Sequence, residues 1–417
     1  MTKSLVLEYS LHELPTAQHR AGLAGLVILA DLLHRKDVGN APDVTAQGSG
    51  HASLTLTEES LTELFDYLYD ASNDLRAESR KRRDNKTQGF IEPEKVVTTT
   101  DADPRTGKPK ENTKYYYPVL APAGRFLTDL QMPESWVRLW RDVTWRCIRA
   151  RPTTRNPYKQ RAAGGHVQEA AKLWQGLQRA DRAVDLASTI FLGAQDANAE
   201  RVPFRGMPSE NLLLHFWPVV MGFGEARRLA VKNGQVKEEG DGFAIVIPDV
   251  ADLQGFTEDF RAAVAQLGSR MSGYRPADAI VSLPAEGALE YMRNVSALVR
   301  ARAQASDAWF SLAGVEVYHL RPTTSRGAEL ASTTVLAADE AVLEGYEAVR
   351  DRYRSLAFRR QLIRNLLRAS PWHRGFDRLF ATFPEGFFLG QHDQAQWFAR
   401  DVSRKFQTEM PQAGSAT

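Results

Sequence analysis

The chain has 417 residues, of which 43% are hydrophobic and 25% charged, and its formal net charge is +2. This composition suits a folded protein of two or three domains and excludes a globally basic one, so attraction for nucleic acid would require local segregation of charge. The single cysteine, Cys147, excludes an internal disulfide and a cysteine-based metal site, and it indicates a reducing cytoplasm. The apolar run of residues 21–33 is too short to span a bilayer and contains Asp31, so we expect no membrane anchor.

The N-terminal part predicts a strand and two helices. Apolar residues alternate over residues 5–9 as in a half-buried strand, and a helix rich in small residues begins at Ala17. Glycine within a helix costs about 1 kcal/mol, so Gly22 and Gly25 predict close packing against a neighbouring element. Residues 36–53 are expected to form a loop, which leads to a second helix with the apolar positions Leu61, Leu64, Phe65, Leu68 and Tyr69.

A basic cluster and then a long polar segment follow this second helix. Residues 76–86 carry six basic and two acidic side chains, a net charge of +4. Residues 84–122 are predicted to form a mobile polar loop, in which lysines and amides stand beside three tyrosines. Contact with nucleic acid and a merely solvated insertion are both consistent with this pattern. The candidate contact residues are Asn85, Lys86, Gln88, Lys108, Asn112 and Lys114.

Residues 134–151 predict an amphipathic helix. One apolar stripe contains Trp136, Trp140, Val143 and Cys147, and the opposite face, expected at the surface, contains Arg138, Arg141, Arg146 and Arg149. Trp145 falls among the arginines, where an indole ring requires a flat or apolar cover. Pro152 is expected to end the helix. Residues 146–161 carry six basic side chains and no acidic one.

This arginine-rich stretch has two interpretations. Its arginines could form a solvated face that pairs with acids elsewhere in the chain. Alternatively, the arginine fork suits phosphate and the interleaved aromatic rings suit base stacking, so the stretch could line a groove for a nucleic-acid strand. The candidate DNA-binding residues are Arg138, Arg141, Trp145, Arg146, Arg149, Arg151, Arg155, Lys159 and Arg161.

The rest of the first 335 residues mixes helices with antiparallel strands. Helices are expected over residues 166–191, 257–267 and 285–305, and strands over residues 315–320 and 332–336. A hairpin is expected from residues 229–232 and 243–247, with Asn233 and Gly234 in a turn that residues 237–242 lengthen. The predicted fold class is therefore α+β, with a mixed α/β region and antiparallel hairpins over residues 1–335.

Residues 336–417 predict a C-terminal helical bundle with a basic outer face. Apolar residues from Val342 to Leu367 keep the spacing of one long helix. Residues 350–368 carry seven arginines against Asp351 alone, a net charge of +6. The candidate DNA-binding residues of this segment are Arg359, Arg360, Arg364 and Arg368.

The sequence contains no recognisable catalytic or cofactor-binding motif. It lacks the HExxH spacing of zinc enzymes, Pro109 stands where a phosphate loop needs Ser or Thr, and Gly222 and Gly224 lack the third glycine of a dinucleotide site. We therefore expect no metal, no cofactor and no catalysis. Two alternatives stay open, a nuclease with a dispersed active site and a non-catalytic scaffold whose basic faces bind acidic proteins.

Four long phrases, taken in order, resemble one known family. They are residues 9–26 (YSLHELPTAQHRAGLAGL), residues 247–253 after the hairpin (IPDVADL), residues 315–320 (VEVYHL), and residues 358–376, which end in SPWHRGF. Together they resemble the large subunit of type I CRISPR interference complexes, known as Cascade, in the variety first described in myxobacterial systems.

This resemblance implies a non-catalytic DNA-binding subunit of an RNA-guided antiviral complex. Its implied partners are target DNA with the guide RNA complex, the other Cascade subunits, and a helicase-nuclease effector that it recruits. Its implied tasks are recognition of the motif that flanks the target, opening of the duplex and retention of the displaced strand of the R-loop. The candidates of the 84–122 loop would read the flanking motif, and the bundle of residues 336–417 resembles the separate small subunit of such complexes.

Overall fold

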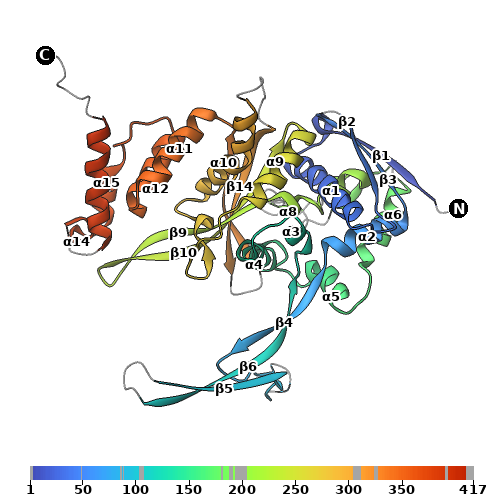
Figure 1. Ribbon diagram of the computed structural model, residues 1–417, viewed down its shortest axis with the longest axis horizontal. Helices are drawn as coiled ribbons and strands as arrows, with labels where there is room; N and C mark the ends of the chain where they lie inside the picture. Colours follow the sequence, from blue (N-terminus) through green and yellow to red (C-terminus); the bar gives the residue numbers. More distant parts are fainter. Residues whose placement is uncertain are drawn as a thin grey trace.

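The computed structural model has a central sheet with helices packed on it, a projecting three-stranded arm and a C-terminal group of helices (Figure 1). The mixed fold predicted from the sequence, with antiparallel strands in the first part and helices at the end, is confirmed. The structure describes residues 3–47, 49–84, 87, 89–102, 108–179, 182–186, 191–192, 204–303, 311–323, 327–389 and 393–409.

A small antiparallel sheet lies at the N-terminal end. Strand β1 (Leu5–Ser10) pairs with β3 (His51–Leu56), and β3 pairs with β2 (Asp43–Gln47). The loop expected over residues 36–53 is therefore wrong where β2 lies and where β3 begins. β2 is an edge strand with alternate residues exposed, so its composition resembles that of a loop although its backbone is paired.

Helix α1 (Ala17–Arg35) is buried along most of its length. A side chain at Gly22 would place its Cβ 2.1 Å from the Leu213 carbonyl oxygen, and a side chain at Gly25 would place its Cβ 2.2 Å from that of Phe216. Another backbone can approach a helix this closely only where the helix has no Cβ. The close packing predicted for both glycines is confirmed.

Two predicted helices are shorter than expected. α4 (Glu134–Val143) continues as a π-helical turn, Thr144–Ile148, and does not reach residue 151. α6 (Gln168–Leu177) ends well before residue 191, because residues 178–183 (QRADRA) offer no apolar face to continue it. The other elements of this region are α2 (Glu58–Leu68), α3 (Arg125–Asp129), η3 (Thr153–Arg155), α5 (Asn156–Ala162), β7 (Val184–Leu186), β8 (Phe204–Gly206), α7 (Pro208–Leu213) and α8 (Trp217–Val220).

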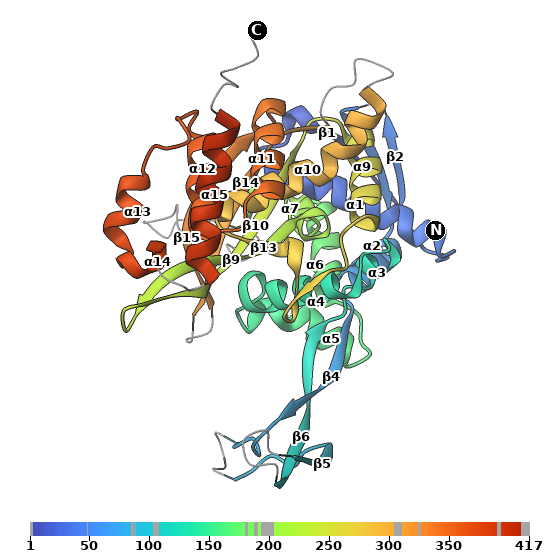
Figure 2. The same ribbon diagram turned by 60° about the vertical axis from the view of Figure 1, so that its left-hand side comes forward.

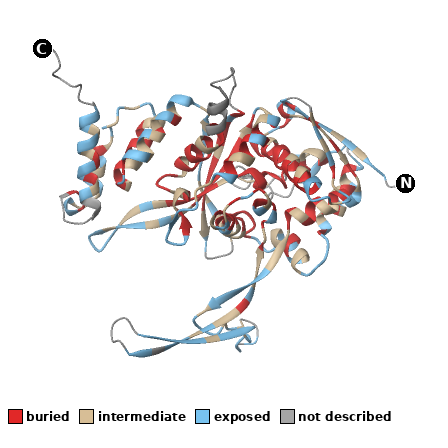
Figure 3. Ribbon diagram, in the orientation of Figure 1, coloured by how far each residue is buried: buried red, intermediate tan, exposed pale blue. Residues whose placement is uncertain are grey.

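The segment expected to be a mobile loop over residues 84–122 forms most of a three-stranded antiparallel arm. Its strands, in sheet order, are β4 (Ala71–Glu78), β6 (Pro109–Pro122) and β5 (Lys95–Ala102). The arm extends away from the body (Figure 2), and most of it is exposed (Figure 3). The loop prediction is wrong over β5 and β6, because strands with two solvated faces are as polar as a loop, while their threonines, valines and tyrosines favour extended backbone.

The central sheet has the strand order β13-β9-β10-β14-β15. Asn233 and Gly234 form a two-residue turn with φ values of 52° and 74°, the left-handed conformation of the tightest hairpins. The longer turn expected over residues 237–242 is wrong, because β10 continues through them and most of them pair with β9. The strands are β9 (Gly222–Lys232), β10 (Gln235–Val250), β13 (Ile280–Val281), β14 (Leu312–Thr323) and β15 (Gly327–Ala337).

Two helices predicted after the hairpin are confirmed, and both pack near this sheet. They are α9 (Leu253–Ala265) and α10 (Pro284–Ala303). A short hairpin lies between them and consists of β11 (Met271–Ser272) and β12 (Arg275–Pro276). The strands predicted over residues 315–320 and 332–336 are confirmed as parts of β14 and β15.

The C-terminal segment is helical, as predicted, but its first helix is broken. The single helix expected from Val342 to Leu367 is wrong, because Tyr353 is extended and Ser355 caps the next helix. The Asp401 carboxylate accepts hydrogen bonds from the backbone N–H groups of Arg354 (2.8 Å) and Ser355 (2.7 Å), which holds the break in place. The helices are α11 (Glu340–Arg352), α12 (Leu356–Leu367), α13 (Phe376–Thr382), α14 (Glu385–Leu389) and α15 (Asp393–Glu409).

The C-terminal helices enclose a second, aromatic core around Phe358, which is fully buried. Leu229 and Val236, from the distal half of the β9–β10 hairpin, pack against this core. The hairpin therefore connects the central sheet with the C-terminal helices, toward which it extends in Figure 1.

Candidate nucleic-acid interface

Several arginines of residues 134–161 have acidic partners inside the chain. Arg151 and Lys159 are exposed on the segment that follows the π-helical turn. Because surface ion pairs are common and weak, pairing by itself does not assign the other arginines a role. The intramolecular pairs are Arg138–Glu134, Arg141–Asp74 and Arg161–Asp66.

Arg149, expected at the surface, is only 4% exposed. Its guanidinium donates a hydrogen bond to the Tyr69 hydroxyl over 3.1 Å. Burial, and then the charge of Arg149, lower the pKa of His215 to about 3. The surface prediction is wrong because it assumes a regular α-helix. The hydrogen bonds of a π-helical turn span one residue more than those of an α-helix, and this extra residue rotates Arg149 toward the core.

Trp145 has the flat cover that its position requires. The Arg155 guanidinium lies 4.0 Å from the Trp145 ring centroid and donates hydrogen bonds to the carbonyl oxygens of Arg149 (2.7 Å) and Trp145 (2.6 Å). Burial lowers the pKa of Arg155. This pair therefore stabilises the turn after the π-helical segment.

Arg146 lines a cleft of about 440 Å³ beside the central sheet, which we call the sheet cleft. In the described part of the chain, Arg146 forms no ion pair, and its guanidinium lies 5.6 Å from the Phe243 ring centroid. The other charged residues that line the sheet cleft are Arg228, Arg275, Arg321, Glu225 and Asp241. Four arginines thus face two carboxylates, and the cleft carries excess positive charge.

A larger groove of about 890 Å³ lies between α12 and α13, and we call it the bundle groove. Its lining contains one carboxylate, Asp377, and five arginines, Arg360, Arg364, Arg368, Arg374 and Arg378. Within the described ranges, none of these arginines forms an ion pair. Burial, and then the neighbouring charge of Arg364, lower the pKa of Arg360; burial and then Arg368 do the same for Arg364. The groove thus holds five positive charges beside one carboxylate, and no ion pair among the described residues neutralises these arginines.

Arg359, the fourth candidate of this segment, lies outside the bundle groove. Its guanidinium pairs with the carboxylate of Glu286 on α10, which is 1% exposed. The structure therefore brings three of the four C-terminal candidates together and directs the fourth to the interface with α10.

The sheet cleft and the bundle groove both border β9. Arg228 lines the cleft and the next residue, Leu229, lines the groove, and because successive residues of a strand point to opposite faces, the two hollows border opposite faces of β9. After burial and Arg364, which lower the pKa of Arg360, two charged residues of the cleft also act on it: Asp241 raises this pKa and Arg228 lowers it. Arg146 and the α12 arginines, far apart in the sequence, therefore flank the same hairpin.

The arm carries the remaining described candidates. Asn112 and Lys114 are exposed on β6, and because they are two residues apart they lie on the same face of the sheet. Lys108 is exposed directly before the strand. Lys95 of β5 is paired with Tyr116 of β6, and its ammonium group lies 5.9 Å from the centroid of the Tyr116 ring. Asn85, Lys86 and Gln88 lie outside the described residues.

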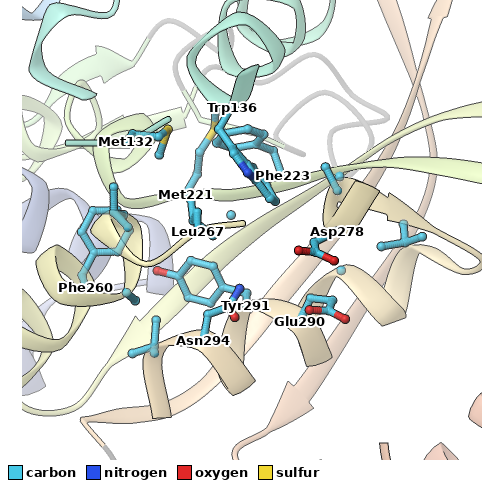
Figure 4. A pocket seen from close by; sticks show the side chains of 18 residues that line it. Met132, Trp136, Met221, Phe223, Phe260, Leu267, Asp278, Glu290, Tyr291 and Asn294 are labelled. Atoms are coloured by element: carbon cyan, nitrogen blue, oxygen red, sulfur yellow. The ribbon is translucent and has the colours of Figure 1, made fainter. Parts of the chain in front are cut away.

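A small cavity of about 60 Å³ beneath the sheet has Asp278 and Glu290 near one another at its edge (Figure 4). Paired carboxylates could suggest a metal-dependent nuclease, the enzyme alternative. However, the Arg350 guanidinium forms ion pairs with both carboxylates, with Asp278 at 3.0 Å and with Glu290 at 2.5 Å. Trp136, Met221 and other mostly apolar residues line the rest, with Asn294 among them, and the volume accommodates about two water molecules. This cavity is a gap in the core.

Neither a metal cluster nor a membrane span is found in the described ranges. No group of three or more His, Cys, Asp or Glu side chains there is arranged to hold a metal ion. No helix among those residues combines the length and the apolar character needed to cross a bilayer.

Burial raises the pKa of the Cys147 thiol to about 12, as expected for an inert cysteine on the apolar stripe.

Sequence reasoning missed several residues that line the two hollows. Arg378 lies on α13, whereas Arg374 lies in the turn before that helix, so helical spacing does not connect them. Arg228, Tyr274 and Arg321 lie in separate strands and turns, so no local pattern connects them. The missed lining residues are Arg228, Tyr274, Arg275, Arg321, Arg374 and Arg378.

Family models match nearly the whole chain in two parts. Residues 41–305 match the model of the type I-B CRISPR Cas8b N-terminal domain, and residues 312–416 match that of the Cas8b C-terminal domain. These matches assign the chain to the large subunits of type I CRISPR complexes. More narrowly, the chain belongs to the type I-B Cas8b family. Among curated proteins no relative matches the chain.

Proposed function

We propose that this large subunit holds one strand of target DNA along the bundle groove and the sheet cleft. The observation that carries the proposal is the set of five arginines against one carboxylate around a groove of about 890 Å³. Like charges held this close repel one another, and a phosphate backbone would neutralise them while releasing its own counterions. Both hollows border the β9–β10 hairpin, so a strand that passes around this hairpin would meet the two basic linings in turn.

The arm is the proposed reader of the motif that flanks the target. A narrow β-ribbon can enter the major groove, where amide and amine groups distinguish bases. Asn112 and Lys114 are on one face of β6, and Lys108 lies at its start. Alanine at a true reader should reduce discrimination between good and poor motifs, whereas an equal loss on every motif would mean phosphate contact alone.

The other tasks belong to the same proposal and rest on family membership. They are opening of the duplex, retention of the displaced strand, contact with the guide RNA complex, recruitment of the helicase-nuclease effector, and absence of intrinsic catalysis. The finer assignment to the myxobacterial variety, the division of the chain at residue 335, and the likeness of residues 336–417 to the small subunit also remain predictions.

A matched pair of double variants tests the strand path. Arg364→Gln with Arg368→Gln removes two groove charges, and Arg35→Gln with Arg205→Gln removes two exposed arginines elsewhere. Binding of a fluorescent single strand should weaken for the groove variant, and the slope of log affinity against log salt should fall by roughly 1.4, about 0.7 for each phosphate contact. The control should change little.

Two outcomes would contradict the proposal. If both double variants lose affinity equally, only net charge matters and the groove has no special role. If the groove variant stays folded and binds DNA with unchanged affinity and salt slope, its arginines serve acidic protein partners, and the scaffold alternative gains support.

A further inference from the structure

We propose that Tyr274 is a stacking platform for an unpaired nucleobase at the sheet cleft, a role that rests on the proposed binding of single-stranded DNA. Tyr274 lies in the turn of the β11–β12 hairpin and is 72% exposed. It lines the cleft together with Arg146, Arg228 and Arg321. Exposed rings beside arginines are the combination with which single-strand-binding grooves hold bases and phosphates.

The Tyr274 ring is supported on one side by a fixed guanidinium group. Arg275 lies 4.7 Å from the Tyr274 ring centroid and is 4% exposed. Its Nε donates to Glu225 over 2.7 Å, and its Nη1 donates to Asp142 over 2.7 Å. Because Arg275 is held by two carboxylates, the ring rests on an immobile neighbour while most of its surface faces solvent. A ring positioned in advance loses little conformational entropy when a base stacks on it.

The phosphates of the same strand would meet the arginines of the cleft. Asp241 is shared between Arg321 (2.9 Å) and Arg228 (3.9 Å), and among the described residues Arg146 has no acidic partner. Arg228 is also 3.7 Å from Glu239, so Arg146 is the cleft arginine that no carboxylate of the described residues pairs with, and its positive charge remains beside the ring. The cleft volume of about 440 Å³ lies within the range of about 300–1,000 Å³ that is typical of pockets for small ligands.

The test uses the full chain with a short single-stranded oligonucleotide and an abasic oligonucleotide of equal length. Tyr274→Ala should lower affinity for the base-containing strand about tenfold, because one base loses its stacking partner. Tyr274→Phe should bind like the wild type, since the ring remains. On the abasic strand, Tyr274→Ala and the wild type should bind equally. Arg146→Gln should instead lower the salt slope by roughly 0.7, whereas Tyr274→Ala should leave that slope unchanged.

Each contrary outcome identifies which proposal fails. If the wild-type chain binds neither oligonucleotide, the proposed function fails. If the wild type binds but Tyr274→Ala binds the base-containing strand equally well, DNA binding stands and base stacking is wrong. If Tyr274→Ala weakens binding to both oligonucleotides alike, the ring shapes the cleft and does not hold a base. Circular dichroism checks that the variants are folded, as the exposure of Tyr274 leads us to expect.

Discussion

Removal of the Glu286 carboxylate should loosen the C-terminal helices from the central core. Glu286 lies on α10 and is 1% exposed. Its Oε2 accepts hydrogen bonds from the backbone N–H and the hydroxyl of Ser282, both at 2.5 Å. Its Oε1 accepts from Arg359 of α12 and from the Tyr346 hydroxyl of α11 at 3.3 Å. One buried carboxylate thus joins three helices.

These contacts set the size of the expected loss in the free energy of unfolding. Hydrogen bonds to a charged group contribute about 1.5–3 kcal/mol each, and loss of one partner of a buried ion pair costs about 3–5 kcal/mol. The Arg359 side chain is 24% exposed and keeps part of its hydration. We therefore expect Glu286→Ala to lower the free energy of unfolding by about 3 kcal/mol, near the lower end of that range.

Urea unfolding followed by far-UV circular dichroism measures this loss. Arg359→Met and the double variant complete a mutant cycle, in which the coupling between the two residues should be about 1–3 kcal/mol. Glu134→Ala removes the exposed partner of Arg138 and should change stability by less than about 0.5 kcal/mol. If Glu286→Ala destabilises the chain no more than Glu134→Ala, the buried carboxylate does not hold the helices together.

Three further outcomes are expected. Gly22→Ala should cost about 3 kcal/mol or more in thermal unfolding, because its Cβ would overlap the Leu213 carbonyl, whereas Gly39→Ala meets nothing within 4 Å and should be tolerated. The pKa of His215 is about 3 in the folded chain and about 6.5 in the unfolded chain, so between these pH values only the unfolded chain binds the proton. The contribution of His215 to the free energy of unfolding should therefore fall by about 1.4 kcal/mol for each unit that the pH falls below about 6.5, and His215→Gln should remove this contribution. The purified chain should leave single- and double-stranded DNA intact with magnesium or manganese; cleavage abolished by one carboxylate substitution would favour the nuclease alternative.

The arm illustrates where sequence reasoning failed. The strands β5 and β6 pair with one another over residues 95–102 and 109–116. Both faces of the arm are largely solvated, so no apolar alternation marks these residues as strands. Residues 237–240 of β10, which the sequence predicts as part of a turn, are likewise mostly exposed, yet all four pair with β9. Periodicity detects a buried face, and it detects backbone pairing only when such a face accompanies it.

Local sequence determined the elements that bury an apolar face and the excess of arginine in two stretches. The stripe of Trp136, Trp140 and Val143 is buried, and Gly22 and Gly25 do meet another backbone. These features depend on residues a few positions apart, whose spacing fixes the face on which they lie.

Only the tertiary structure decided which arginines remain available to a ligand. Arg149 and Arg359 are as basic in the sequence as Arg146 and Arg364, yet the first pair faces Tyr69 and Glu286 while the second lines the two hollows. An arginine's role depends on whether a carboxylate or hydroxyl from a distant segment reaches it. Here those partners are 73 or more residues away in the sequence. The packing of α10 on α12 brings Glu286 to Arg359, and the packing of the end of α2 on the π-helical turn brings Tyr69 to Arg149.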